Sequence, residues 1–131
     1  MPLVARVFLF AGALNAMLAV LLGAFGAHAL RGRLSSAMLA VYHTGNQYHF
    51  YHALGLLAVG LVAAYHPTSP LVKWAGGLMI GGIILFSGSL YVLAITGATR
   101  LGAITPIGGL AFIIGWLLLA IAVLKASTGS P

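Results

Sequence analysis

The sequence predicts an all-α membrane protein in which four transmembrane helices form an antiparallel bundle, with a short amphipathic helix on the membrane surface before the second span. Of the 131 residues, 62% are hydrophobic and 5% are charged, against about 25% charged residues in a typical soluble domain. The apolar residues also form four runs that can each cross roughly 30 Å of hydrocarbon. Because the segments between them are short, we expect antiparallel neighbouring helices within one transmembrane domain, residues 1–131.

The first span is predicted at residues 7–30. Arg6 precedes this run and the Ala27-His28-Ala29 segment ends it, and together they resemble a secretory signal peptide with its cleavage site. The apolar run is longer than the apolar core of such a peptide. We therefore expect a retained transmembrane helix rather than a cleaved leader.

The second span is predicted at residues 46–65, after a surface helix. Arg31 and Arg33 interrupt the apolar pattern, and a serine shortly after them can cap a new helix. From Leu34 to Tyr42, apolar residues recur at helical spacing with polar residues between them. This pattern predicts a short amphipathic helix, which we expect to bend near Gly45 into the second span.

The third and fourth spans are delimited by proline and by a capping threonine. The turn at residues 66–70 contains two prolines, which prevent the second helix from continuing. The third span is predicted at residues 71–95. Thr105 and Pro106 are suited to the N-cap and the first position of a helix, so the fourth span is predicted at residues 106–125.

The charged residues are all basic, six Lys or Arg without any Asp or Glu. They occur singly or as one pair at the ends of apolar runs, which is typical of lipid headgroup contacts and not of a nucleic-acid-binding surface. Arg31, Arg33 and Arg100 lie on one predicted side of the membrane and are candidate headgroup-binding residues. The other side carries Arg6, Lys73 and Lys125. Basic residues at the ends of the spans predict membrane lipids as partners. Because the two sides carry three Lys or Arg residues each, the distribution of positive charge predicts no orientation in the membrane.

The absence of acidic residues and of cysteine excludes several kinds of chemistry. Paired-carboxylate hydrolysis, acidic proton relays and sites for Mg²⁺ or Ca²⁺ require oxygen anions that these side chains do not supply. Disulfides, thiolate metal sites and cysteine nucleophiles are excluded as well. The sequence therefore predicts neither catalytic residues nor a metal site nor a cofactor, and we expect a protein that is not an enzyme.

Polar side chains within the predicted spans are expected to gather toward one face of the membrane, because the antiparallel topology brings the relevant helix ends together. His52 would lie about 9 Å inside the second span and Ser87 about 12 Å inside the third. Asn15 lies alone in the middle of the first span and is expected to form a hydrogen bond between helices. The residues of this predicted polar layer are His28, Tyr48, His49, His52, Ser87, Ser89, Tyr91 and Thr105.

Three interpretations of the predicted polar layer are open. The side chains can satisfy one another and hold the bundle together, or they can line a pocket for a lipid headgroup, a quinone or another small amphiphile. Alternatively, His49 and His52, with His28 facing them, can ligate a metal ion or haem. The first interpretation is favoured, because no carboxylate is present to orient a ligating histidine. A channel is the least favoured, because one neutral polar layer makes a poor ion pathway.

Small residues recur every four positions on three of the predicted helices. Such residues let helix backbones approach closely in a membrane, either within a bundle or between subunits. Packing within the bundle is the favoured interpretation, although we also expect a homo-oligomer or a larger membrane complex, because four short helices bury little surface. The positions are Ala19, Gly23 and Ala27, then Gly77 and Gly81, then Ala111 and Gly115.

Five separated motifs resemble those of one protein family. They are GAFGAHAL at residues 23–30, Tyr48 with the following HAL at residues 52–54, LFSGSLY at residues 85–91, TPIGG at residues 105–109, and the Gly-Trp pair at residues 115–116. In this order they resemble the family catalogued as domain of unknown function 423, whose animal members are called transmembrane protein 256. The resemblance covers essentially the whole chain.

The resemblance implies a four-helix membrane protein, located in bacteria in the cytoplasmic membrane with both termini in the cytoplasm. It implies no activity, because the family has no assigned one. Most residues of the predicted polar layer fall within the family motifs. We therefore expect a structural or accessory membrane subunit or a homo-oligomer, and the alternative is a binder of a lipid, a quinone or haem in a pocket lined by the layer.

Overall fold

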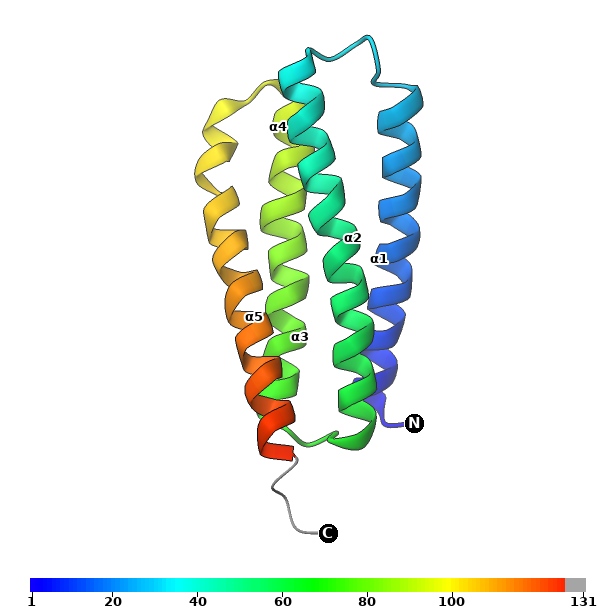
Figure 1. Cartoon of the computed structure of the whole chain (residues 1–131), viewed down its shortest axis with the longest axis vertical. Coiled ribbons are helices and arrows are strands. Elements are labelled where there is room, and N and C mark those ends of the chain that lie inside the picture. The colour runs from blue at the N-terminus through cyan, green and yellow to red at the C-terminus, as the bar shows by residue number, and fades with distance from the viewer. Residues whose placement is uncertain (127–131) are drawn as a thin grey trace.

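The computed structural model describes residues 1–126. In this part of the chain four long helical segments lie side by side, and no β-strand is present (Figure 1). Each is long and apolar enough to span a membrane, which confirms the predicted all-α bundle. The third segment is built from three consecutive elements and the fourth from two. The elements are α1 (Leu3–His28), α2 (Ser36–Tyr65), α3 (Pro70–Gly82), η1 (Ile83–Gly88), α4 (Ser89–Thr96), η2 (Thr99–Ala103) and α5 (Thr105–Ala126).

The predicted surface helix before the second span does not exist as a separate element, and this prediction was wrong. Its residues form the first turns of α2, which begins at Ser36 and is capped by the Ser35 side chain accepting a 3.2 Å hydrogen bond from the Met38 amide. The helix does not break at Gly45. A Cβ atom at this glycine would lie 3.0 Å from the Cβ of Leu90, so Gly45 is needed for close helix packing rather than for a bend.

The third span is not a uniform α-helix. Its middle is a π-helical segment, η1 (Ile83–Gly88), between α3 and α4. The span ends at Gly97, whose φ of 72° places it in the left-handed region that commonly terminates helices. π-Helical segments are rare and frequently occur at functional sites, and nothing in the apolar sequence of this run indicated one.

The main core lies where α1, α2, α3 and α5 meet, toward the end of the bundle at which α1 begins and α5 ends. Glycines allow large side chains to enter it. The ring of Phe8 lies directly over Gly76, and the ring of Phe112 lies directly over Gly82. A smaller cluster of Leu30, Tyr42 and Ala94 closes the opposite end.

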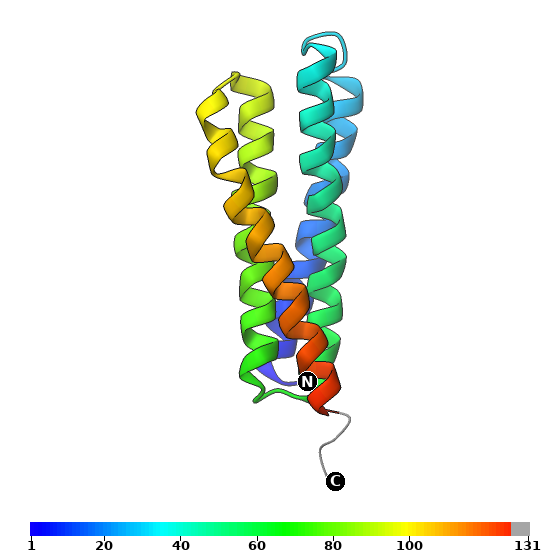
Figure 2. The same cartoon turned by 60° about the vertical axis from the view of Figure 1, so that its left-hand side comes forward.

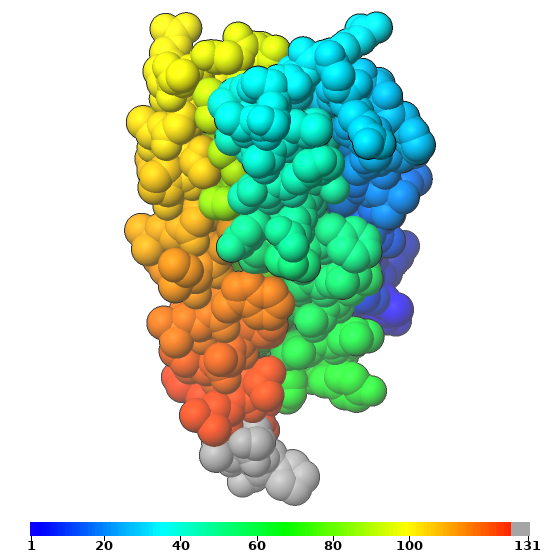
Figure 3. Space-filling view, turned by 45° about the horizontal axis from the view of Figure 1, so that its top comes forward, coloured from blue at the N-terminus to red at the C-terminus, as the bar shows by residue number. Residues whose placement is uncertain are grey.

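The helix faces outside this core carry large apolar side chains. Leu3, Phe10, Ile113 and Leu124 are all more than 60% exposed. Figure 3 shows α5 bordering α2 on one face of the molecule. Figure 2 shows that α5 is oblique to the other helices, so its last turns approach the end of α2. A surface of this kind is suited to lipid, where exposed apolar side chains cost nothing.

The small residues divide into two groups. Gly23 packs against the Asn46 side chain and Gly115 against the Ala75 carbonyl, which confirms packing within the bundle for these two positions. For Gly77 and Gly81 the same prediction was wrong, because a Cβ atom at either position would meet nothing within 4 Å. These two glycines leave an open strip on the outer face of α3.

Candidate functional site

His49, which forms hydrogen bonds to two other helices, lies near the middle of α2. His49 lies 13 residues after Ser36 and 16 residues before Tyr65, which corresponds to about 20 Å and about 24 Å along the helix axis. Asn15 is similarly central in α1. The sequence placed the start of the second span at Asn46, ten residues after the observed start of α2, so His49 lies deeper in its helix than expected, whereas Tyr91 lies five residues before the end of α4. The position of the layer relative to a membrane face stays a prediction.

Four side chains from three helices form what we call the central network, namely Asn15, Asn46, His49 and Tyr91. The Nε2 atom of His49 lies 2.9 Å from Oδ1 of Asn15, and its Nδ1 atom lies 2.9 Å from the Tyr91 hydroxyl. The Asn46 amide nitrogen donates to the Tyr91 hydroxyl at 3.1 Å and to the Ala19 carbonyl at 2.7 Å. The network therefore ties α1 and α4 to α2, which carries both Asn46 and His49.

The hydrogen bonds of the central network run in one direction. The amide nitrogen of Asn15 donates to the Ala11 carbonyl at 2.8 Å, so its oxygen must accept from Nε2–H of His49. In a neutral imidazole the other nitrogen is then an acceptor, so the Tyr91 hydroxyl donates to Nδ1. The hydroxyl oxygen in turn accepts from Asn46. A single tautomer of His49 thus satisfies every bond.

His52 forms a second cluster, with α5. Its Nδ1 atom lies 2.7 Å from the Tyr48 carbonyl and therefore carries the proton, and its Nε2 atom accepts a 3.0 Å hydrogen bond from the Trp116 indole. The ring also stacks on Phe112, with the two ring centroids 3.4 Å apart and an angle of 9° between the planes. The Tyr48 side chain packs over Phe86 in the same aromatic group.

The ring nitrogens of His49 and His52 are all engaged by neighbouring groups. Ligation of a metal ion or haem iron by either ring would require at least one of these hydrogen bonds to break. Within residues 1–126, no three His, Cys, Asp or Glu side chains are grouped so that they could hold a metal ion. The geometry therefore gives the metal and haem interpretation no support.

Three further residues of the predicted layer lie apart from the central network. Ser89 and Thr105 pair with each other at 2.6 Å, and the Ser89 hydroxyl also bonds to the Phe86 carbonyl at 2.9 Å, so this pair joins α4 to α5. Ser87 in η1 is completely buried and its hydroxyl has no partner among the described residues. Its position faces Gly45 of α2, whose added Cβ atom would lie 3.3 Å from the Ser87 carbonyl oxygen.

His28 is not part of any of these clusters, because it is exposed at the end of α1. Arg31 and Arg33 follow it in the α1–α2 connection, and Arg100 lies in η2. All three arginines are exposed, and Figure 1 shows both connections at the same end of the bundle. This placement agrees with the topology expected from the sequence, and their binding of headgroups stays a prediction.

Sequence reasoning named Asn15, His49 and Tyr91 of the central network and missed Asn46. The expected interhelical hydrogen bond of Asn15 is confirmed by its contact with His49. Asn46 was missed because it was placed at the start of the second span, where an amide contacts water. With α2 beginning at Ser36, the Asn46 amide lies inside a long apolar helix. That position would have indicated a hydrogen bond between helices, as it did for Asn15. The Trp116 contact of His52 had no signal in the sequence.

Comparison with known proteins shows to which family this chain belongs. Residues 22–109 match the family described as protein of unknown function (DUF423). This chain belongs to that family. It is 54% identical to the UPF0382 membrane protein YwdK of Bacillus subtilis over 120 aligned residues, and the alignment covers 92% of this chain and 98% of the relative. It is 56% identical over 120 residues to the UPF0382 membrane protein SERP0230 of Staphylococcus epidermidis, covering 92% and 97% respectively.

The comparisons confirm the resemblance inferred from the five motifs and the assignment of the chain as a membrane protein. The names of these relatives mention no catalytic activity. No solved structure matches the chain. The matched segment of the family includes Asn46, His49 and Tyr91, whereas Asn15 lies before it.

Proposed function

We propose that this DUF423 protein is a non-catalytic structural or accessory membrane subunit, in which the central network holds α1 and α4 against α2. The observation that carries the proposal is the one-directional set of hydrogen bonds through His49, which engages both ring nitrogens. A histidine that acts as a general acid or base needs a ring nitrogen within hydrogen-bond reach of its substrate. Here each nitrogen is directed at another helix of the same bundle.

Two further observations support a structural role. His52 is likewise engaged at both nitrogens, and its contacts join α2 to α5. The sequence supplies no side-chain carboxylate that could act as an acid, a base or a nucleophile. Polar groups in hydrocarbon are costly when unpaired, so groups that pair across helices specify one arrangement of the bundle. Of the three interpretations of the polar residues, mutual satisfaction therefore has the most support.

We further propose that the protein assembles into a homo-oligomer or a larger membrane complex. Gly77 and Gly81 form an open strip on the outside of α3, and small residues at this spacing allow another helix to approach closely in lipid. The proposed location is a bacterial cytoplasmic membrane with both termini in the cytoplasm. The start of α1 and the end of α5 lie at the same end of the bundle, which supports placing both on one side of the membrane. The choice of the cytoplasmic side rests on the family resemblance.

One observation favours a second candidate function, the binding of a small amphiphile with a hydroxyl group, such as a quinol. The Oδ1 atom of Asn46 lies beside Gly23 and has no hydrogen-bond partner among the described residues. It borders an outward-facing groove of about 270 Å³ that is otherwise lined by apolar residues, including Val20 and Phe50. A hydroxyl donor in this groove would satisfy the amide oxygen.

Replacement of His52 by Ala tests the part of the structural proposal that concerns the contacts between α2 and α5. The change removes the acceptor of the Trp116 indole and the stacking on Phe112, so the variant is expected to unfold at a lower temperature in detergent. His43→Ala is the matched control, because His43 lies exposed on the same helix. An unchanged melting temperature with intact assembly would contradict the structural role. Native mass spectrometry of the wild type distinguishes the structural role from the binding of a small amphiphile. Binding predicts a bound small molecule of defined mass, and a purely structural role predicts none.

A further inference from the structure

The groove beside Asn46 contains a hydrogen-bond acceptor that the bundle leaves unsatisfied. Both hydrogens of the Asn46 amide nitrogen are used inside the protein, on the Ala19 carbonyl and the Tyr91 hydroxyl. The amide oxygen has no partner among the described residues, and Asn46 lines an outward-facing groove. A group that satisfies this oxygen must therefore enter the groove from outside and must be a donor.

This acceptor lies at a depth where water is absent. α2 has 30 residues and is about 45 Å long, whereas the hydrocarbon core of a bilayer is about 30 Å thick. If α2 spans this core, its middle, about residues 46–55, lies in hydrocarbon for any position of the core along the helix. Unpaired polar groups are costly in hydrocarbon, so the groove favours an occupant with a donor at this depth.

Tyr51 carries an unused donor at the same depth. Its side chain is 48% exposed in the middle of α2, although tyrosines of membrane proteins are enriched at the two interfaces. The Tyr51 hydroxyl accepts a 2.6 Å hydrogen bond from the Gln47 side-chain amide, and its own hydrogen is unused among the described residues. The bond to Gln47 also places this hydroxyl level with the residue that follows Asn46.

Asn46 and Tyr51 lie on the two sides of the exposed face of α2, about 140° apart around the helix axis. Asn46 lies toward α1, because it bonds to the Ala19 carbonyl. Tyr51 lies toward α5, because its ring contacts Tyr48, which stacks on Phe112. A twofold axis parallel to the helices places each side of this face opposite the other side of the same face in a second copy. It therefore brings the donor of each copy to the groove of the other, at the same depth.

We propose that the protein forms a twofold dimer through the outer face of α2, in which the Tyr51 hydroxyl of each copy donates to the Asn46 Oδ1 atom of the other. The inference rests on the proposed homo-oligomer and names its interface. The volume of the groove, about 270 Å³, favours a side chain, because sites for small molecules commonly have about 300–1,000 Å³. α2 contains no Lys or Arg, so two copies can approach through it without placing like charges opposite each other.

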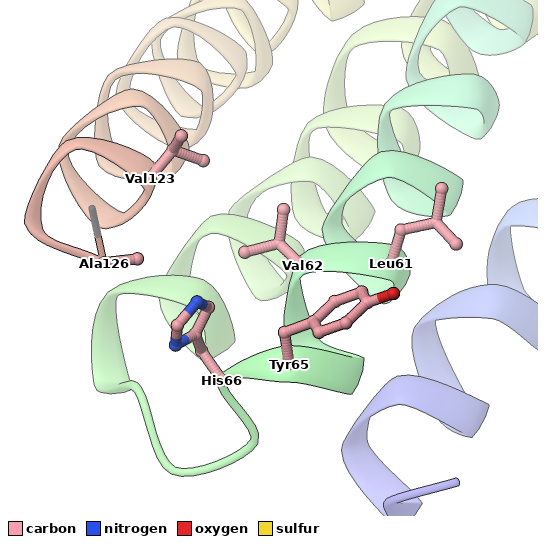
Figure 4. A pocket seen from close by; sticks show the side chains of 6 residues that line it. All are labelled: Leu61, Val62, Tyr65, His66, Val123 and Ala126. Atoms are coloured by element: carbon pink, nitrogen blue, oxygen red, sulfur yellow. The ribbon is translucent and has the colours of Figure 1, made fainter. Parts of the chain in front are cut away.

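The remainder of the proposed contact face is apolar. Phe50, Leu54 and Leu61 are exposed, and their spacing places them on the side of α2 between the groove and Tyr51. Figure 4 shows Leu61 and Tyr65 in the last turns of α2, with the Tyr65 ring directed outward from the helix. These side chains extend the face from the level of the groove to the end of α2, where a partner's α2 can pack along it.

Disulfide cross-linking of the full-length protein in membranes locates the interface. The chain has no cysteine, and a disulfide requires Cα atoms within about 7 Å, so a single introduced cysteine reports only contacts near the axis. Leu54→Cys is expected to cross-link to its own copy several times faster than Ile84→Cys. Ile84 is the matched control, because it is exposed and lies three residues after Gly81 of the open strip on α3.

The outcomes of cross-linking separate this interface from the homo-oligomer itself. Cross-linking of the Ile84 variant alone would place the oligomer contact at the strip on α3 and refute the α2 interface. Equal rates for the two variants would refute it as well, because they indicate random collision. Cross-linking in neither variant, together with a monomer in liposomes, would refute both the interface and the proposed homo-oligomer.

Tyr51→Phe tests the hydrogen bond, because it removes the hydroxyl and keeps the ring. An average interhelical hydrogen bond in a membrane corresponds to about threefold in an equilibrium constant. Two equivalent bonds are lost in a twofold dimer, so the dissociation constant is expected to rise about ninefold. Energy transfer between labelled copies, diluted stepwise in liposomes, measures it. Tyr48→Phe is the matched control, because Tyr48 is also exposed on α2 but packs toward α5.

The control is expected to leave the dissociation constant unchanged. Equal effects of the two tyrosine variants, or an unchanged dimer in Tyr51→Phe, would overturn the proposal. A monomer that retains a bound small molecule of defined mass in native mass spectrometry would assign the groove to an amphiphile instead, and would overturn it too.

Discussion

The central network can be tested by removing its middle member. His49→Phe keeps a flat, buried ring in α2 but leaves the Asn15 amide oxygen and the Tyr91 hydroxyl without their partner. An unsatisfied buried group costs about 1–3 kcal/mol, whereas interhelical hydrogen bonds measured in a membrane protein average about 0.6 kcal/mol. The lower values apply here, because helices unfolded in detergent still find polar partners. We therefore expect the free energy of unfolding to fall by about 1–2 kcal/mol for the two groups together.

The same site permits a double-mutant cycle, which isolates the bond between His49 and Asn15. Asn15→Leu removes the acceptor of Nε2–H, and the double variant Asn15→Leu with His49→Phe removes both partners. The combined loss is expected to be smaller than the sum of the single losses by about 0.6–1.7 kcal/mol. Reversible unfolding in mixed detergent and SDS micelles, followed by tryptophan fluorescence, measures all three variants.

Two results would refute this reasoning. Additive losses would mean that the two side chains do not interact energetically. A loss as large in His43→Phe as in His49→Phe would mean that the effect belongs to the aromatic substitution in α2 and not to the network. The control is expected to stay within about 0.5 kcal/mol of the wild type, because His43 is exposed and has no hydrogen bond with the described residues.

Two further substitutions test the packing of the bundle by the same unfolding assay. Gly76→Ala is expected to destabilise the protein, because the new Cβ atom would overlap an aromatic ring from α1, whereas Gly77→Ala has open space and is expected to gain up to about 1 kcal/mol from helix propensity. Equal effects at the two glycines would contradict the assignment of Gly76 to the packed face of α3 and of Gly77 to its open face. Ser87→Ala is expected to leave stability unchanged or raise it, because the buried hydroxyl it removes has no partner. A clear loss of stability would reveal a hydrogen bond that the described residues do not account for.

The sequence alone was sufficient for the class of fold and for the family. Four long apolar runs with few charges can be stable only in lipid, where helices satisfy their own backbone groups. The prolines after His66 located the end of α2 by local chemistry, because they act on the backbone within one turn. Thr105 was predicted as the N-cap of the fourth helix, and this was wrong, because α5 begins at Thr105 itself and its hydroxyl bonds to Ser89 and to the Leu101 carbonyl instead of capping the helix. Asn15 was identified as an interhelical residue because a lone amide inside an apolar run must find a partner.

The start of α2 and the faces of the helices were decided by the tertiary structure. In water, the alternation of polar and apolar residues indicates which face of a helix is buried, but in a membrane both faces are apolar and this signal is lost. The sequence could therefore not tell that Gly76 faces the core while Gly77 faces outward. The amphipathic start of α2 was interpreted as a surface helix, although Gly45 packs closely against α4 and the helix continues.

The composition of the central network depended on the register between helices. Because α2 begins at Ser36, Asn46 and His49 lie 10 and 13 residues into the helix rather than near its start, where His49 meets Asn15 and both residues reach Tyr91. A hydrogen bond between helices requires an alignment within about 1 Å, less than the 1.5 Å rise of one residue. The sequence by itself thus determined that this chain spans a membrane with four helices and carries polar groups inside them, whereas only the packing of the helices decided which of those groups meet.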